Sequence, residues 1–176
     1  EQLTMLRSIP DVTVYRPGDA VECAAAYRYA FTSNSRPTAI ILSRQNLVNN
    51  PETSFEGSLK GGYVVSKEQS EAMLTLLATG SEVNTAISIQ KMLLNNGVDT
   101  RVVSLPALDV FDRQSEDYKN EVFGVDYDKR VFLEAGKSDM LYKYAKTVFG
   151  IDRFGESAPS NDVFNDLGYT AETLAE

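Results

Sequence analysis

The sequence contains no histidine among its 176 residues. This absence excludes Ser-His-Asp hydrolysis, Cys-His proteolysis and acid/base work by an imidazole. It also excludes nearly all zinc sites that use histidine. Any chemistry at neutral pH must therefore come from other side chains, from a cofactor, or from another part of a longer protein.

Cysteine is almost absent as well, since Cys23 is alone. One cysteine forms no disulfide within the chain, which fits a reducing compartment and predicts a cytoplasmic location. Cys23 shares one face of a predicted helix with apolar residues, and without histidine nothing of that kind lowers its pKa. We therefore expect a core thiol rather than a nucleophile, packed on the face that also carries Ala20, Ala24, Tyr27 and Phe31.

Long apolar runs are missing, and none approaches the ~18 residues that a membrane helix needs. The start, EQLTMLRSIP, has neither the basic residues nor the apolar stretch of a signal peptide. Basic residues are outnumbered 17 to 25, which gives a net charge of −8. We therefore expect no membrane and no nucleic acid partner. A small phosphorylated metabolite stays compatible, because one local arginine dominates within a Debye length of about 8 Å.

The residues that are present alternate between short apolar runs and helical patterns. Continuous apolar runs predict strands covered on both faces, as in parallel sheets, at 12–16, 38–43, 72–78, 100–105 and 130–135. Helices are predicted at 19–31, 81–97, 115–123 and 139–150. For the second helix, Thr79 and Glu82 have the spacing of a capping box, and Gly97 suits its end. The fold class is α/β, with a mainly parallel open sheet and flanking helices.

Between Asn46 and Glu71 the pattern weakens into a stretch rich in Asn, Gly, Ser and charge, which predicts a linker. The piece before it has two strands and one long helix, too few for an independent sheet. Because the chain also lacks an initiator Met, we expect a fragment that begins inside a longer polypeptide. The predicted division is a partial α/β domain at 1–55, a linker at 56–70 and a fuller α/β domain at 71–176.

Arg44 is the main candidate for ligand binding. It follows a predicted strand directly in PTAIILSRQNL, and ligands of open α/β sheets gather at the carboxyl ends of strands. Its guanidinium suits two-point contact with a phosphate or carboxylate. The competing interpretation is an arginine that satisfies local carbonyls or an acid at an interface.

Other candidates are weaker. TGSEV (79–83) places backbone amides at a helix start but is neither a Walker loop nor GxGxxG, so a plain cap is the default. GIDRFGESAP (150–159) predicts a loop held by an internal ion pair. Several acids lie near predicted strand ends: Asp109, Asp112, Glu134 and Asp152. Their spacing selects no catalytic pair, so no catalytic or metal-binding residue is assigned.

Several stretches, taken together and in order, resemble transketolase, a thiamine-diphosphate enzyme. The resemblance covers nearly the whole chain and matches the end of the family's pyrimidine-binding domain followed by its C-terminal domain. The stretches are EQLTMLRSIPDVTVYRPGDAVE, RPTAIILSRQNL, KGGYV, LLATGSEV, RVVSLPALDVFDRQSEDYKNEV, GIDRFGESAP and VFNDLGYTAETLAE.

The resemblance implies a transferase that moves a two-carbon ketol unit between sugar phosphates, within a homodimer. It implies that Arg44 binds the substrate phosphate. The family's residues for thiamine diphosphate and for Mg²⁺ (or Ca²⁺) have no counterpart here, so we expect this fragment alone to bind no cofactor and to be inactive. The alternatives are a sister thiamine-diphosphate enzyme such as dihydroxyacetone synthase, or a non-catalytic binding or regulatory module; SRQNL and GIDRFG argue against a pyruvate dehydrogenase β-subunit.

Overall fold

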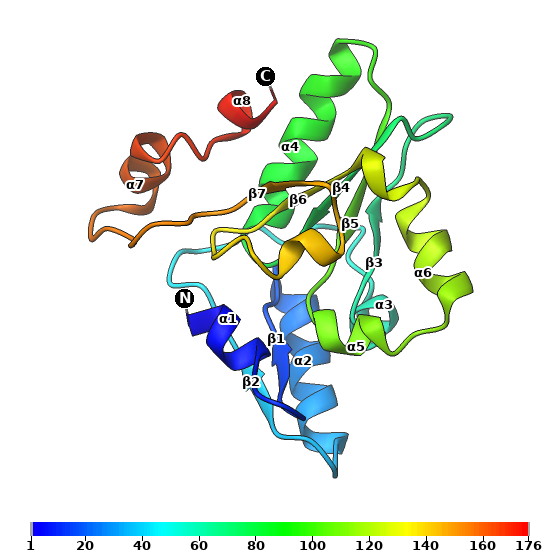
Figure 1. Ribbon diagram of the computed structural model, residues 1–176, viewed down its shortest axis with the longest axis vertical. Coiled ribbons are helices and arrows are strands. Elements are labelled where there is room, and N and C mark those ends of the chain that lie inside the picture. The colour runs from blue at the N-terminus through cyan, green and yellow to red at the C-terminus, as the bar shows by residue number, and fades with distance from the viewer. Residues whose placement is uncertain (1, 176) are drawn as a thin grey trace.

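A five-stranded sheet forms the centre of the molecule in the computed structural model, which describes residues 2–175 (Figure 1). The strand order is β3-β5-β4-β6-β7. The strands β4, β5, β6 and β7 are parallel, whereas β3 is antiparallel to β5. Their bounds are Tyr63–Ser66 (β3), Leu74–Ala78 (β4), Thr100–Ser104 (β5), Arg130–Leu133 (β6) and Thr147–Phe149 (β7).

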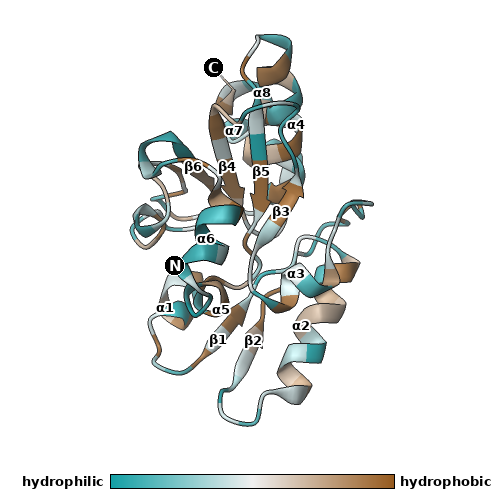
Figure 2. Ribbon diagram, turned by 90° about the vertical axis from the view of Figure 1, so that its right-hand side faces the viewer, coloured by the Kyte–Doolittle hydropathy of each residue, from teal (hydrophilic) through white to brown (hydrophobic). Residues whose placement is uncertain are grey.

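Helices cover both faces of this sheet. One face packs against α4 (Glu82–Asn95) and α8 (Ala171–Leu174), through a buried cluster that includes Val83, Leu76 and Leu133. The other face packs against elements that include α5 (Leu108–Asp112), α6 (Glu116–Phe123) and the 3-10 helix η2 (Leu141–Lys143). Further short helices are η1 (Tyr127–Lys129) and α7 (Ser160–Asp166). Burial on both faces explains why the central strands read as continuous apolar runs, which Figure 2 shows for much of β4.

The preceding residues form a smaller unit beside the sheet. Its strands β1 (Thr13–Tyr15) and β2 (Thr38–Ile40) pair in parallel and make a two-stranded sheet of their own. The helix α2 (Ala20–Thr32) packs on them, and α1 (Gln2–Arg7) and α3 (Phe55–Leu59) lie nearby (Figures 1 and 2). We call residues 2–50 the N-terminal region and residues 61–175 the C-terminal region.

The sequence patterns predicted the α/β class and five apolar strands, which correspond to β1, β2, β4, β5 and β6. These predictions are confirmed, and each strand is one to three residues shorter than predicted. Helices α2, α4 and α6 also lie where predicted. Gly97 follows α4 with φ +79°, the left-handed conformation expected after a helix end.

The predicted helix at 139–150 is wrong. Only the single turn η2 is helical there, and Thr147–Phe149 forms β7, which pairs in parallel with β6. Val148 lies opposite Phe132 in that pairing. β-branched and aromatic residues suit a pleated edge strand, and pairing across the sheet overrides the weak helical pattern.

The stretch predicted as a linker at 56–70 also contains regular structure. Most of α3 and all of β3 lie within it, and β3 alternates buried and half-buried residues along its length. A Cβ placed on Gly57 would come within 2.5 Å of the Tyr63 side chain, so the helix and strand are in close contact. A polar composition therefore concealed an edge strand, and where the domain boundary runs stays a prediction.

Helix α2 presents the opposite face to the one expected. Tyr27 and Phe31 are 45% and 83% exposed and stack on each other with ring centroids 6.1 Å apart. The buried residues are instead Glu22, Ala25 and Ala26. Apolar residues surround most of this helix, so their positions alone did not identify the packed side. Cys23 is consequently half-buried rather than part of the core.

Candidate functional site

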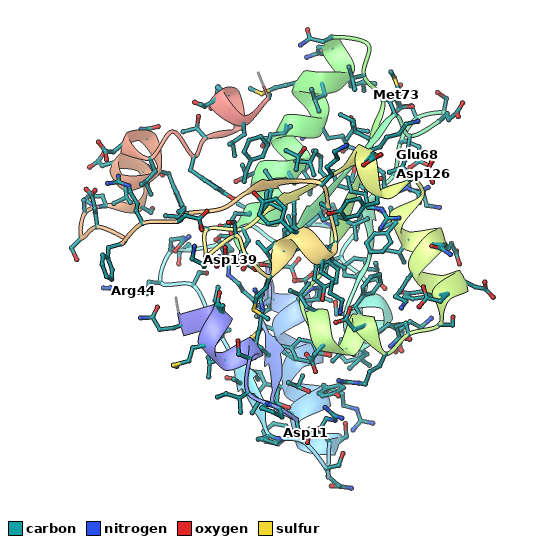
Figure 3. The ribbon with its side chains drawn as sticks, viewed as in Figure 1. Asp11, Arg44, Glu68, Met73, Asp126 and Asp139 are labelled. Carbon is teal, nitrogen blue, oxygen red and sulfur yellow. The ribbon has the colours of Figure 1, made fainter. Side chains whose placement is uncertain are left out.

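Arg44 lies in the loop that follows β2, where the last ladder bond is donated by Ile41 N to Tyr15 O at 2.8 Å. Its side chain points away from the packed core, beside the connection between β7 and α7 (Figure 3). The loop that carries Arg44 and the connection between β7 and α7 line an open cavity of about 570 Å³. Residues of both regions line it: Arg44, Gln45, Glu156, Ser157, Ala158 and Ser160.

The described contacts of Arg44 bear on the two interpretations of this residue. Among residues 2–175, no ion pair or protein hydrogen bond involves the Arg44 guanidinium, whereas Arg7, Arg16, Arg101 and Arg113 are all paired with carboxylates. Arg44 is exposed, so its donors face the cavity and solvent. These contacts leave the guanidinium available to a ligand, and the role of Arg44 stays a prediction.

The carboxyl ends of β4 and β6 hold a second cluster of charged residues. Glu134 follows β6 and is 1% exposed. It accepts two hydrogen bonds from Arg7, at 2.7 Å to Oε1 and 2.8 Å to Oε2, and one from Thr79 Oγ1 at 2.5 Å. Glu82 forms an ion pair with Arg16 and accepts from Ala135 N at 3.0 Å. Two arginines of the N-terminal region thus neutralise two buried acids of the C-terminal region.

These pairings set the ionisation of the cluster. Burial by itself raises the pKa of Glu134, but the hydrogen bonds and charge of Arg7 and the charge of Arg16 outweigh it, so its pKa is lowered. Burial lowers the pKa of Arg16, while Glu82 and Glu134 raise it, and the net direction is upward. Glu134 and Arg16 are therefore held in their charged forms at neutral pH. Ligands of open sheets usually bind at such strand ends, but here the neighbouring region fills the position.

The TGSEV turn belongs to this cluster and not to a phosphate site. Thr79 Oγ1 binds Glu134 and Arg16, and Ser81 precedes α4 without a side-chain cap bond, so the predicted capping box does not form. Gly80 has φ +55°, and a Cβ there would come within 2.7 Å of Arg16 Nη1. Arg16 therefore packs directly against the turn, and both line a cavity of about 290 Å³.

Glu22 forms a third polar contact between the regions. It accepts from Ser104 Oγ at 2.5 Å, Tyr63 Oη at 2.8 Å and Gly18 N at 2.6 Å. Burial raises its pKa, and these hydrogen bonds offset only part of that effect. Unlike Glu134, Glu22 has no cation among these partners, so the protonated form gains stability in the folded state.

The remaining acids do not form a catalytic pair. Asp109 accepts from Thr13 and Arg113, and Asp112 accepts from Lys143 and Tyr144. Asp152 accepts from Ser138 N and Oγ, which lowers its pKa to about 2. In the GIDRFGESAP loop the internal ion pair joins Arg153 to Glu156 at 2.9 Å. Within residues 2–175, no three Cys, Asp or Glu side chains are arranged to hold a metal ion.

Sequence reasoning proposed Arg44 but did not propose Glu156, Ser157 or Ser160, which line the same cavity. It also missed the buried pairs Arg7–Glu134 and Arg16–Glu82. The only signal for the pairs was a charged residue directly at the end of an apolar strand, as with Glu134 after RVFL. That signal indicates a buried charge but does not identify its partner.

Each of the two regions matches a known protein family. Residues 1–49 match the family described as "Transketolase, pyrimidine binding domain", and residues 61–170 match "Transketolase-like TK C-terminal domain". The chain is 45% identical to the transketolase of Bacillus subtilis over 181 residues, which cover 99% of this chain and 27% of that protein. The chain thus spans about a quarter of the length of the curated relatives it matches.

Solved structures give the same result. A transketolase of Pichia stipitis in complex with sedoheptulose-7-phosphate has a TM-score of 0.92 and 36% identity, covering 98% of this chain and 25% of that one. A split-gene transketolase, described as an inactive β4 tetramer, has a TM-score of 0.77 and 25% identity, covering 99% of this chain and 59% of that one.

Proposed function

The chain belongs to the transketolase family, and we propose that it forms the C-terminal part of an enzyme that transfers a two-carbon ketol unit between ketose and aldose sugar phosphates. Identity of 45% across 99% of the chain supports the family reaction for the whole protein. Coverage of 27% of the relative supports a part of that protein rather than all of it.

The observation that carries the proposal is the position of Arg44. It stands at the carboxyl end of a strand, lines an open cavity and has no carboxylate partner within the described chain. A planar fork of donors binds a phosphate through two oxygens at once. The solved complex of the Pichia stipitis relative holds a sugar phosphate, which is the class of ligand that we assign to Arg44.

Thiamine diphosphate, when bound, supplies the carbanion chemistry of the family. Within residues 2–175, no three Cys, Asp or Glu side chains lie together to hold a metal ion, and the family resemblance matches no thiamine-diphosphate residue to this chain. We therefore assign cofactor and metal binding to the rest of the protein. The role of this chain is to hold the phosphate end of the sugar, away from the reacting carbon.

The C-terminal region has a structural role in this proposal. Its strand ends bind Arg7 and Arg16 instead of a small ligand, so it supports the region that carries Arg44. We extend the proposal to a homodimer in the cytoplasm, and to a domain boundary between about 55 and 71, on the family resemblance and the single cysteine. No helix within residues 2–175 is long and apolar enough to cross a membrane.

A sister enzyme such as dihydroxyacetone synthase is the alternative within the same chemistry. The second alternative, a stand-alone module without catalysis, has one specific observation in its favour. The split-gene relative shows that a chain including this part occurs as a separate, inactive assembly. For this chain too we expect no activity when it is tested by itself.

The test compares the 176-residue chain with the longer protein that contains it, in a ketol-transfer assay with a ketose phosphate donor and an aldose phosphate acceptor. We expect transfer by the longer protein and none by the chain alone. Calorimetric titration of the chain with thiamine diphosphate and Mg²⁺ should give no saturable signal. A micromolar signal would contradict the assignment of cofactor binding to the rest of the protein, and a longer protein without ketol transfer would contradict the function.

A further inference from the structure

The cavity at Arg44 has a second wall, made by the segment that connects β7 to α7. Arg44 and Gln45 come from the N-terminal region, and the other lining residues, which include Glu156, Ser157 and Ser160, come from the C-terminal region. The cavity therefore contains one cation, Arg44, and one anion, Glu156. A phosphate bound by Arg44 shares this space with the carboxylate.

Glu156 takes part in an exposed ion pair on the surface of this segment. Arg153 Nη1 contacts Glu156 Oε1 at 2.9 Å, and Arg153 Nη2 contacts Asp166 Oδ2 at 3.1 Å. One guanidinium thus lies between two carboxylates, which leaves this group of three with a net negative charge. Glu156 lines the cavity, whereas Asp166 lies at the end of α7 and does not.

We propose that Glu156 is a specificity-determining residue that limits how strongly the Arg44 cavity attracts negative charge. This inference rests on the proposed function and adds the charge class of the substrate. A carboxylate beside a bound phosphate opposes the attraction of Arg44, and the opposition grows with the charge of the ligand. The cavity therefore favours ligands of lower negative charge, and it disfavours sugars whose second phosphate adds further charge near the site.

The other role open to Glu156 is to hold Arg153 in place. Asp166 provides a matched control, because Asp166→Asn removes one negative charge and one contact of Arg153, as Glu156→Gln does. Of these two acids, only Glu156 lines the cavity. If anchoring of Arg153 is what matters, the two substitutions should act alike. If the charge inside the cavity matters, only Glu156→Gln should change phosphate recognition.

The experiment uses the longer enzyme, unsubstituted and with E156Q or D166N. The measured quantities are kcat and KM for an aldose monophosphate, an aldose bisphosphate and the unphosphorylated aldose, at low and high ionic strength. We expect E156Q to lower KM for the monophosphate roughly two- to fivefold at low salt, because the two groups interact through solvent, and to lose most of this gain at about 1 M salt. The bisphosphate should gain more, and the unphosphorylated aldose should be unchanged.

D166N should leave all three KM values close to those of the unsubstituted enzyme. Equal effects of E156Q and D166N, no effect of E156Q, or an equal change for the unphosphorylated aldose would overturn the role of Glu156 while leaving ketol transfer intact. An unsubstituted enzyme without any preference for phosphorylated aldoses would contradict the proposed phosphate site itself.

Discussion

The two regions of the molecule differ in how they bury their strands. In the C-terminal region, β4, β5 and β6 are covered by helices on both faces. In the N-terminal region, β1 and β2 form a sheet of only two strands, which is marginal by itself. One face of α2 leaves Tyr27 and Phe31 exposed. The comparison teaches that the N-terminal region, which carries Arg44, depends for its order on contacts outside its own core.

Those contacts lie at the interface between the regions. Backbone bonds run from Arg16 N to Pro106 O at 2.7 Å and from Gly80 N to Arg16 O at 3.0 Å. Tyr15 and Ala26 pack with Ala107 and Val110 in one buried cluster. With the ion pairs of Arg7 and Arg16, they anchor the end of β1 to the strand ends of the larger sheet.

The largest expected effect comes from breaking the buried pair. Glu134→Gln leaves the Arg7 guanidinium buried without its countercharge, so we expect a loss of about 3–5 kcal/mol in the free energy of unfolding. The measurement is urea unfolding of the 176-residue chain. Glu116→Gln, in the exposed pair with Lys119, is the control and should cost less than about 1 kcal/mol. Similar losses for both variants would remove the distinction between the interface and the surface.

The pH dependence sharpens the comparison between Glu134 and Glu22, two of the buried acids at the interface. The lowered pKa of Glu134 contributes stability that is present above the ordinary value of 4.5 and is lost as pH falls through the folded-state pKa. The raised pKa of Glu22 has the opposite sign, since it favours folding below 4.5 and this contribution is lost as pH rises toward the folded-state pKa.

Urea unfolding over a range of pH tests these signs. The stability difference between the unsubstituted chain and E134Q should grow as pH rises through the acidic range. The difference between the unsubstituted chain and E22Q should shrink over the range above 4.5. Parallel curves for both variants would contradict the assigned ionisation states.

The smallest effect concerns local opening. Residues 152–162 are exposed throughout, and Arg153 is held only by exposed ion pairs. We expect trypsin to cut after Arg153 before it cuts after Lys60, which follows α3 and donates backbone bonds to it. Mass spectrometry of early fragments decides the order. Early cleavage after Lys60 would contradict this order and support the flexible linker that the composition of 56–70 predicted.

The strands β4, β5 and β6 of the larger sheet were predictable because burial on both faces leaves continuous apolar runs such as AMLTLLA and RVFLEA. The strand β3 was not, since only Tyr63 and Val65 are buried and the flanking residues are polar or glycine. The strand β7 was missed because its three residues gain their pairing from β6. In both cases a partner distant in sequence determines the local structure.

For the candidate site, Arg44 could be proposed from the sequence because it closely follows a strand end and its guanidinium suits a phosphate. The Arg7–Glu134 pair was not, as 127 positions separate the two residues. Glu156 was missed for the same reason, because its cavity forms only when the β7–α7 connection folds back onto the Arg44 loop. Sequence patterns identify chemistry within one segment, and folding assembles it across segments.

The role of Arg44 is the central claim, and kinetics of the longer enzyme with Arg44→Ala and Arg44→Lys test it most directly. A remote phosphate makes similar contacts in the ground and transition states, so its loss should raise KM far more than it lowers kcat. We predict a loss of about 2–3 kcal/mol, or roughly 30- to 150-fold in kcat/KM, for a sugar phosphate with Arg44→Ala. Arg44→Lys should recover only part of it, and the unphosphorylated sugar should be nearly unaffected. Equal losses on the two sugars would contradict phosphate binding and assign Arg44 to the fold or the dimer.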